Sequence, residues 1–355
     1  MIEINGAHGE GGGQLLRMAL SLAALTRRAT RVNHIRAGRP NPGLAPQHVA
    51  ALGALTQLAQ AKVEGAKVGS TAVTFRPGPL IGGHFELDVG TAGSVTLVLQ
   101  AALLPALFAP SPTALRISGG TDVRWSPPAD YTRHVFLPLL SRMESRVTLH
   151  VERRGYYPRG GGRIQAEITP TAHLRPLALG APPDVSRIGG HAHVGNLPEN
   201  VVGRMKRRTE RVLDEFQPIA IDTSTYGPQE AVGRGGALVL WAERGDTFLG
   251  ASALAEKGVK AETLAERAGR ELRADLLAKV TLDRYAADQL LPFMALASGP
   301  SVFRVREASG HLKTLFWLLP HFLDVNFRIQ EETAGTRVEV TPSRTWSSAE
   351  TPPGA

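Results

Sequence analysis

A single histidine, His311, lies in the stretch ASGHLKTLFWLLPHF (308–322), between a glycine and a long apolar run. The serine and glycine before that run indicate a helix start, so we expect the imidazole in the first turn of a largely buried helix. The chain contains no cysteine, which excludes thiolate nucleophiles and cysteine-ligated zinc. Histidine, carboxylates and backbone groups must therefore do any chemistry, although a helix cap or a surface histidine would explain the same pattern.

The segment GAHGEGGGQLLR (6–17) packs glycines against a second predicted helix start. This arrangement exposes backbone N–H groups and directs the positive end of the helix dipole at an anion. The segment matches neither the dinucleotide-binding fingerprint nor the P-loop. Glu10 among the glycines could hold a hard divalent cation that bridges phosphates. The alternative is a tight turn between a strand and a helix.

Two arginines, Arg36 and Arg39, lie in the Gly/Pro-rich segment IRAGRPNPGLAPQH (35–48). The prolines prevent a helix over most of this segment, so the guanidinium groups are presented on a rigid turn. Paired guanidinium groups suit an oligophosphate or an RNA end, and Arg17 of the neighbouring helix could join them. A solvated basic loop is the alternative.

Three polar residues, Tyr285, Asp288 and Gln289, lie in YAADQLLP (285–292) at the i, i+3 and i+4 spacing that places them on one helix face. They could line a ligand site, and an ordinary amphipathic helix would look the same. We predict that SGGTDVRWSPPADY (118–131), with small residues and two prolines, is a structural turn.

His191 and His193 alternate on a predicted strand and could pair as metal ligands, but no third ligand is spaced nearby. We expect an exposed strand face instead. The basic run RMKRRTER (204–211) is predicted to be a solvated helix face, with RNA contact as the alternative.

The elements that must position these residues follow the order βαβαββ. The first repeat of that order spans residues 2–78, and the second begins at residue 85. A third repeat begins near residue 174, is interrupted, and resumes at residue 283. His311, LAPQH and PPADY then start equivalent helices, so the three helix starts are expected to line one central site.

We therefore predict an α+β fold. Its large domain (1–181 and 281–342) contains three βαβαββ repeats, and a small α/β domain (182–280) is inserted in the third repeat. Residues 343–355 lack periodicity and are predicted to be a disordered tail.

The composition favours an anionic partner. The chain of 355 residues is 43% hydrophobic and carries a net charge of +8, and only 7 of its 40 basic residues are lysine. Arginine suits phosphate recognition, although a GC-rich genome would produce the same bias. The sequence has no run of eighteen apolar residues and no secretory signal pattern, so a soluble cytoplasmic protein is expected.

Several motifs taken together, GEGGGQLLR, RAGRPNPGL with QH, GTAGS, SGGTD with PPADY, GYYPRGGG, ADQLLP and SGHLKT, resemble the RNA 3'-terminal phosphate cyclase family in order across residues 1–342. The resemblance implies an ATP-dependent enzyme that converts an RNA 3'-phosphate end into a 2',3'-cyclic phosphate. It also implies Mg²⁺ or Mn²⁺ as a cofactor, and three repeats similar to the C-terminal domain of translation initiation factor three.

The family's site residues are carried over by position. The nucleotide-accepting histidine is His311 and the metal-binding glutamate is Glu10. The residues implied for the substrate phosphate and the RNA end are Arg17, Arg36, Arg39 and Gln47. Those implied for the nucleotide pocket are Gln100, Pro128, Phe248, Tyr285, Asp288 and Gln289.

Two positions depart from the family pattern and affect the expected phosphate contacts. Asn41 stands where a basic residue is frequent, and Leu315 follows Thr314 where an asparagine is frequent.

The resemblance implies that the neutral imidazole of His311 attacks the α-phosphorus of ATP and holds AMP as a phosphoramidate. AMP would pass to the RNA 3'-phosphate, and the 2'-hydroxyl would close the ring. One alternative is a noncatalytic RNA-binding factor of ribosomal RNA processing with the same fold, whose members lack the histidine. A carbon-transfer enzyme built on related repeats is the other, and it would bind a phosphorylated small molecule.

Overall fold

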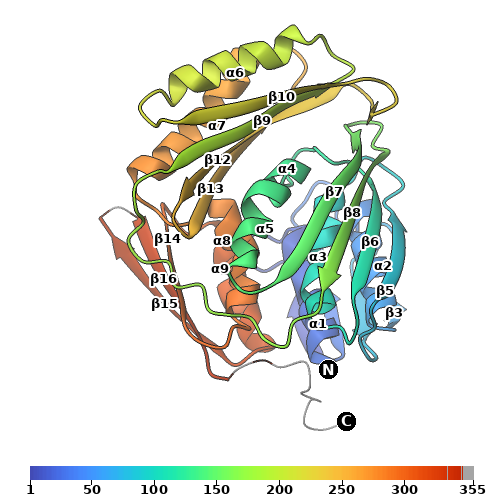
Figure 1. Ribbon diagram of the computed structural model, residues 1–355. Helices are drawn as coiled ribbons and strands as arrows, with labels where there is room; N and C mark the ends of the chain where they lie inside the picture. Colours follow the sequence, from blue (N-terminus) through green and yellow to red (C-terminus); the bar gives the residue numbers. More distant parts are fainter. Residues whose placement is uncertain (334, 345, 347–355) are drawn as a thin grey trace.

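The first sheet is built from residues near the N-terminus. The computed structural model describes residues 1–333, 335–344 and 346, which form a mixed α/β fold with four sheets (Figure 1). The first elements are β1 (Ile2–Asn5), α1 (Gly13–Thr26), β2 (Thr30–Asn33), α2 (Pro46–Leu58), β3 (Lys62–Glu64) and β4 (Val73–Arg76). The strand order is β1-β2-β4-β3, with β1 and β2 parallel and the other neighbours antiparallel. Helix α1, which connects β1 to β2, permits that parallel pair.

The second sheet contains the same pairing pattern. Its elements are β5 (Gly83–Asp88), α3 (Val95–Leu107), β6 (Thr113–Gly119), α4 (Ala129–Tyr131), α5 (Leu137–Ser141), β7 (Arg146–Gly155), β8 (Gly162–Thr169) and the short β11 (Ala231–Val232). The order is β11-β7-β8-β6-β5. β5 and β6 are parallel, whereas β6, β8 and β7 pair antiparallel, as in the first sheet.

The helix that the sequence predicted after PPADY is not continuous. A π-helical turn over Thr132–Phe136 separates α4 from α5. Pro138 follows that turn and has no N–H to donate to the preceding turn, which accounts for the irregular hydrogen bonding.

The third sheet is smaller. Its elements are α8 (Arg284–Met294), β14 (Ser301–Val305), α9 (Gly310–Leu318), a 3₁₀ turn (Leu319–His321), β15 (Val325–Glu332) and β16 (Gly335–Pro342), and its order is β14-β16-β15. The third βαβαββ order was expected to begin with a strand near residue 174, and that prediction is wrong. Only isolated bridges form there, from Leu174 to Ala297 and from Ala178 to Val302, because Pro176 between them cannot donate to a ladder.

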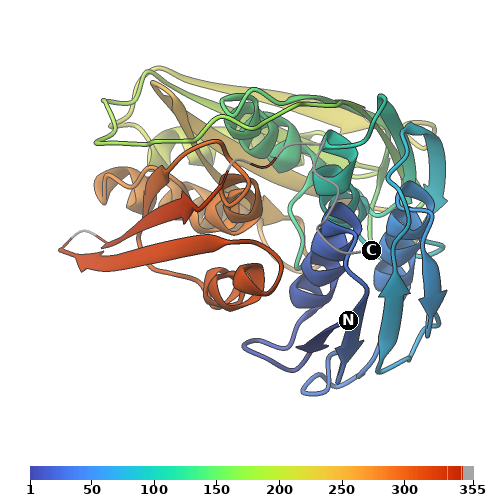
Figure 2. The same cartoon turned by 90° about the horizontal axis from the view of Figure 1, so that it is seen from below.

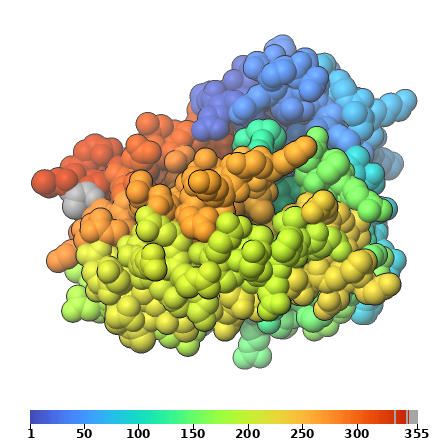
Figure 3. Space-filling model, turned by 90° about the horizontal axis from the view of Figure 1, so that it is seen from above, coloured from blue at the N-terminus to red at the C-terminus, as the bar shows by residue number. Residues whose placement is uncertain are grey.

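Residues 187–277 form the fourth sheet and two covering helices. The elements are β9 (Arg187–Gly195), α6 (Asn200–Val212), β10 (Ile219–Tyr226), β12 (Gly235–Arg244), β13 (Thr247–Leu254) and α7 (Ala261–Leu277), in the order β10-β9-β12-β13. Strand β13 was not predicted. One face of this sheet and the two helices share an apolar cluster distinct from the main core. In the view of Figure 3, these residues cover much of one face of the molecule.

The main core brings several helix starts together. Helix α1 contacts α2, α3 and α9, and α8 contacts α9. Nearly all of α1 is buried, because its residues are apolar on every side apart from a few positions. The view from below shows these helices between the sheets (Figure 2). This packing places the loop before α1 beside the start of α9.

Candidate active site

His311 and Glu10 form a pair at the start of α9. Nδ1 of His311 lies 3.1 Å from Oε2 of Glu10, and each side chain is 42% exposed. The other carboxylate oxygen faces Gly310, where an added Cβ would overlap it. Partial burial lowers the pKa of His311, and the guanidinium of Arg17 lowers it further, whereas Glu10 acts in the opposite direction. The imidazole is therefore held neutral and accessible.

The helix start itself is open to an anion. Ser309 caps α9 by accepting a hydrogen bond from Leu312 N at 2.9 Å. Its hydroxyl donates to Oδ1 of Asp288 at 2.5 Å. In the part of the chain that the structure describes, the backbone N–H groups of Gly310 and His311 have no hydrogen-bond partner. The first turn of α9 can therefore stabilise negative charge beside the imidazole.

Arg17 is a buried cation without a partner. Its exposure is 8%, and within residues 1–333, 335–344 and 346 its guanidinium has no hydrogen bond or ion pair. Burial lowers its pKa to about 10. Because an uncompensated buried charge is costly, the arrangement suits a bound anion. Gly13 permits the approach, since an added Cβ there would crowd Arg17 and overlap His48.

His48 was not singled out from the sequence. It is 4% exposed, and its Nδ1 accepts a hydrogen bond from Ala45 N at 2.9 Å. Burial, with the charges of Arg17 and Arg36, lowers its pKa to about 3. A neutral histidine thus lies beside Arg17, and its place in LAPQH was the available signal.

Arg36, Arg39 and Gln47 lie around the same loops. Arg36 has φ +53° and donates to Gly43 O at 2.9 Å, which holds the turn in shape. Arg39 is exposed and donates to the backbone oxygen of Glu10 at 3.1 Å. Gln47 accepts a hydrogen bond from Ser94 N at 3.2 Å. The structure therefore brings Arg39 to the His311–Glu10 pair and ties Gln47 to the GTAGS loop.

Several residues expected at a nucleotide pocket lie near Arg17. One small cavity is lined by Gln14, Arg17, Met18, Gln100, Ala101 and Asp288. Burial raises the pKa of Asp288 to about 7, whereas the hydrogen bond from Ser309 lowers it. Gln289 donates to Tyr285 O at 2.9 Å, and Tyr285 remains 41% exposed. Gln100 and Asp288 are thus brought together with Arg17.

Asp283, which no motif predicted, joins three parts of the chain. Its carboxylate caps α8 through Tyr285 N and Ala286 N, and it accepts from Tyr131 OH at 2.7 Å and Gly250 N at 2.8 Å. An aspartate before a helical pattern was the available signal.

The hydrogen bonds accepted by Asp283 form a junction, the Asp283 junction, that explains how the other two expected pocket residues, Pro128 and Phe248, are held. Pro128 directly precedes α4, which carries Tyr131, and Phe248 lies on β13 near Gly250. Pro128 is buried, and the partly buried Phe248 packs against the main core. Hydrogen bonds from Tyr131 and Gly250 to Asp283 connect both segments to the start of α8.

The two departures from the family pattern lie in different environments. Asn41 is exposed on its loop, whereas Leu315 is fully buried in the core. Thr314 donates to Gly310 O at 2.8 Å and faces Gly9. Leu315 therefore has no access to an anion at the start of α9.

The prediction that His191 and His193 lie on an exposed strand face is wrong. His193 is fully buried, with its Nε2 3.4 Å from Asp130 and 3.6 Å from Asp122. Nδ1 of His191 lies 2.9 Å from Asp130. Arg154 donates to Asp130 at 2.8 Å and 2.9 Å and to Asp122 at 3.4 Å. This acidic cluster belongs to the turn 118–131, which covers the strand face.

Arg154 supplies the positive charge that a metal ion would otherwise bring to this cluster. Burial opposes ionisation of Asp130, but its hydrogen bond with His191 and the charge of Arg154 hold the pKa of Asp130 well below its usual range. Burial and Arg154 lower the pKa of His193. Among the described residues, no group of three or more histidine, aspartate or glutamate side chains is arranged so that it could hold a metal ion.

The basic run 204–211 is only partly a solvated face. On α6, Arg204 lies 3.6 Å from Glu262, and Arg208 pairs with Glu266 of α7, whereas Arg207 and Arg211 are exposed. The charges of α7 therefore neutralise half of the arginines that the sequence suggested for RNA contact.

No helix within the described part of the chain is both long and apolar enough to cross a membrane.

Comparison with known proteins identifies the family. The sequence model of RNA 3'-terminal phosphate cyclase matches residues 8–329. The RNA 3'-terminal phosphate cyclase of Nitrosospira multiformis is 48% identical over 342 residues, covering 96% of this chain and 97% of that protein. The protein of that name from Methanopyrus kandleri is 42% identical, covering 96% of this chain and 99% of its own. The protein of that name from Pyrococcus furiosus is 40% identical, and the match covers 93% of this chain and 95% of that protein. The chain belongs to the RNA 3'-terminal phosphate cyclase family.

Proposed function

We propose that this protein uses ATP to convert an RNA 3'-phosphate end into a 2',3'-cyclic phosphate, with His311 as the nucleotide-accepting residue. One observation carries the proposal. An accessible histidine, held by Glu10, lies at an open helix start beside Arg17, a buried cation that has no partner in the described chain. The names of the relatives and the family agree with this activity.

The nucleophilic atom is Nε2 of His311. Because Nδ1 lies 3.1 Å from Glu10, its proton is held by the carboxylate and the lone pair is on Nε2. Nε2 forms a bond to the α-phosphorus of ATP, and the bond from that phosphorus to the pyrophosphate oxygen breaks. The lowered pKa of His311 favours this reaction, since only the neutral ring is nucleophilic.

The anionic groups are held by the start of α9 and by the arginines. Arg17 would make charge-assisted hydrogen bonds to a phosphate, and each such bond is worth roughly 1.5–3 kcal/mol. The free N–H groups of Gly310 and His311 would stabilise charge developing on the α-phosphorus. Arg36, Arg39 and Gln47 would bind the phosphate of the RNA end.

Glu10 is the residue that fits a divalent cation, and it would act together with substrate oxygens. Mg²⁺ typically takes one or two carboxylates, waters and phosphate oxygens, so a single carboxylate among glycines is a suitable donor set. A bound Mg²⁺ or Mn²⁺ would neutralise negative charge on the pyrophosphate. Glu10 also orients His311, and its two oxygens permit both roles.

Two further bond exchanges complete the reaction. An oxygen of the RNA 3'-phosphate attacks the phosphorus of AMP and the P–N bond to His311 breaks. The 2'-hydroxyl then attacks the RNA phosphorus, loses its proton and expels AMP. Arginines that hold the end near attack geometry make this closure effectively unimolecular.

The nucleotide base and sugar would occupy a pocket formed by several segments. The residues proposed to line it are Gln100, Pro128, Phe248, Tyr285, Asp288 and Gln289. The Asp283 junction supports this assignment, because it connects the segments of Pro128 and Phe248 to the start of α8.

We also propose that the large domain, 1–181 and 281–342, consists of three βαβαββ repeats with residues 182–280 inserted. The shared order of β1-β2-β4-β3 and β5-β6-β8-β7 supports two repeats. In the third, Ala178 bridges Val302 of β14 in parallel, as β1 does β2. The predicted tail, 343–355, lies mostly outside the described residues.

The function is tested with a short RNA that carries a labelled 3'-phosphate, incubated with ATP and Mg²⁺. Conversion to a cyclic end makes the label resistant to phosphatase, and we expect conversion only with ATP present. An RNA whose last sugar is 2'-deoxy should accept AMP and stall as an adenylated end. If the ribo end stays phosphatase-sensitive while RNA still binds, the protein is a noncatalytic RNA-binding factor.

A further inference from the structure

Two aromatic side chains project into solvent from adjacent loops. Trp125 is 93% exposed and Tyr157 is 77% exposed, the highest values among the large apolar residues described. We infer that these rings, with Arg159 and Arg234, bind the single-stranded nucleotides just upstream of the RNA 3'-end. The inference rests on the proposed function for its substrate, and it adds a site away from the reacting phosphate.

The Trp125 ring stands on a rigid support. Its backbone has φ +61°, a region that bulky residues rarely adopt. Ser126 donates to Val123 O at 2.8 Å, and Thr96 donates to Pro127 O at 2.7 Å, so the turn is fixed on its C-terminal side. These hydrogen bonds hold the Trp125 backbone in its left-handed conformation and so fix the position of the ring. An exposed ring on a rigid base loses little entropy when a base stacks on it.

The Tyr157 ring is supported in the same way. The preceding residue, Tyr156, is buried, and its hydroxyl lies 3.0 Å from Nδ1 of His193. Gly160 N donates to Tyr156 O at 2.8 Å and closes the turn. Tyr156 also forms a bridge with Asp122, which sets the two aromatic loops side by side. The turn between β7 and β8 can be followed in Figure 1.

Free positive charge accompanies the rings. Arg159 and Arg234 are exposed, and neither has an ion pair or a side-chain hydrogen bond with any other described residue. Tyr156 N donates to Val232 O at 3.1 Å, which brings the segment of Arg234 beside the Tyr157 turn. Arg124, in contrast, is neutralised by Glu256 at 2.7 Å. Exposed aromatic rings with unpaired arginines are the combination that binds single strands without strong sequence preference.

The loops continue into the proposed site for the RNA end. An added Cβ at Gly160 would lie 2.6 Å from Thr91 O, so this turn packs directly on the GTAGS loop. Gly120 N donates to Gly93 O at 2.8 Å, and Ser94 N donates to the side chain of Gln47 at 3.2 Å. An RNA strand whose 3'-end is held at Gln47 would therefore pass the GTAGS loop and reach the loops that carry Trp125 and Tyr157.

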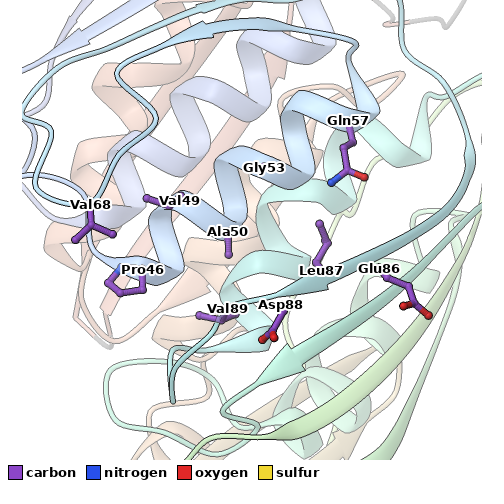
Figure 4. Close-up of a pocket in the computed structure, with 10 residues that line it drawn as sticks. All are labelled: Pro46, Val49, Ala50, Gly53, Gln57, Val68, Glu86, Leu87, Asp88 and Val89. Atoms are coloured by element: carbon purple, nitrogen blue, oxygen red, sulfur yellow. The ribbon is translucent and has the colours of Figure 1, made fainter.

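A groove elsewhere on the surface is a poor path for the same RNA strand. It has a volume of about 380 Å³ and lies between α2 and β5, with Pro46, Val49 and Ala50 on one side. Figure 4 shows the carboxylates of Glu86 and Asp88 at the opposite side of this groove. Glu86 is partly matched by Arg116 at 3.5 Å, but the carboxylate of Asp88 would repel the RNA backbone, whereas the edge with Arg159 would attract it.

The test compares substrates of different length. We would measure KM and kcat for cyclisation of a dinucleotide and a twelve-nucleotide RNA, both with a 3'-phosphate, and the anisotropy of a labelled twelve-mer. In Trp125→Ala and Tyr157→Ala, KM and Kd for the twelve-mer should each rise about 10-fold, since stacking on one ring contributes that much. The dinucleotide KM, kcat and AMP transfer from ATP should be unchanged. Ile329→Ala, which removes an exposed apolar side chain of β15, is the control.

Charge is tested separately. Arg159→Ala and Arg234→Ala should each lower the slope of log Kd against log salt for the twelve-mer by about 0.7, as expected for one phosphate contact to a single strand. Equal losses on both RNA lengths, or unchanged twelve-mer binding in both aromatic variants, would overturn the inference, and the second result would leave the rings available to a protein partner. Binding is measured without ATP, so it decides the inference even if the wild type proves unable to cyclise RNA.

Discussion

Two histidine–carboxylate sites in this molecule differ in what surrounds them. At the start of α9, His311 and Glu10 are each 42% exposed, and the second ring nitrogen has no protein partner in the described chain. On β9, His193 is fully buried between Asp122 and Asp130, whose charges are matched by Arg154. The pKa of both histidines is lowered chiefly by burial.

The difference separates a site that can react from one that holds the fold. At the buried site the carboxylates are already matched by a cation, so little is left for a ligand to satisfy. At α9, Nε2 of His311, the N–H groups of the first turn and the guanidinium of Arg17 have no partner among the described residues and remain available. A lowered histidine pKa alone therefore does not identify the catalytic residue, and accessibility must accompany it.

Removing the cation from the buried site should have the largest effect on stability. Arg154→Met leaves Asp122 and Asp130 as buried charges without their matching cation, so we expect the free energy of unfolding to fall by about 3–5 kcal/mol. Chemical denaturation measures this value. Arg146→Met, at an exposed position of the same strand, should change it by less than about 0.5 kcal/mol. Similar losses in the two variants would show that the cluster has no special role.

A second buried histidine should make stability depend on pH. The pKa of His48 is about 3 in the folded protein, below its ordinary value, so the unfolded chain binds the extra proton. Its contribution to stability is complete above about pH 6.5 and falls by roughly 1.4 kcal/mol per pH unit below it.

The variant His48→Asn, which keeps an acceptor for Ala45 N, should lose this dependence. Asp275 and Asp288, whose pKa values are raised to about 7, act in the opposite direction, so the informative quantity is the difference between the two proteins. The advantage of the wild type over the variant should shrink by about 2 kcal/mol between pH 6.5 and pH 5. If the stability difference between the two proteins stays constant over this range, His48 is protonated in the folded protein as readily as in the unfolded chain. His150→Asn, on an exposed site of β7, is the control.

A smaller change should disturb the reactive pair without unfolding the protein. Gly310→Ala favours the helix by about 1 kcal/mol, but the new Cβ would displace the carboxylate of Glu10 from His311. We expect AMP transfer to slow about 10-fold, the cost of one lost hydrogen bond, with no loss of thermal stability. Gly53→Ala in α2, where an added Cβ meets nothing within 4 Å, should leave the rate unchanged. Equal rates in both variants would argue against a role for the Glu10 contact.

The sequence predicted where helices start better than it predicted which distant segments pack against a given side chain. Apolar periodicity placed α1, α3, α8 and α9 closely, and Ser309 before a glycine marked the start of α9, because these signals are local. The pattern could not show that the side chains of His191 and His193 are covered, since the covering aspartate Asp130 is 61 residues away from His191 in the chain. Alternation on a strand defines two faces and leaves open which of them is packed.

The candidate site was hard to predict for the same reason, because its residues lie far apart in the sequence. No periodicity connects Glu10 to His311, and the motif resemblance alone brought them into one expected site. Strand β13 was missed because its sequence, TFLGASAL, carries a glycine at Gly250 and weak alternation. That glycine is required by packing, since an added Cβ would lie 2.6 Å from Tyr131 and Val135.

Covalent labelling with ATP that carries a radioactive α-phosphate shows whether His311 accepts the nucleotide. The wild type with Mg²⁺ should retain label through denaturing electrophoresis, and mild acid should release it, as expected for a phosphoramidate. His311→Ala should abolish labelling while keeping its thermal unfolding temperature, whereas His321→Ala, from the end of the same helical segment, should label normally. Label that persists in folded His311→Ala would contradict the assignment of His311 as the nucleophile.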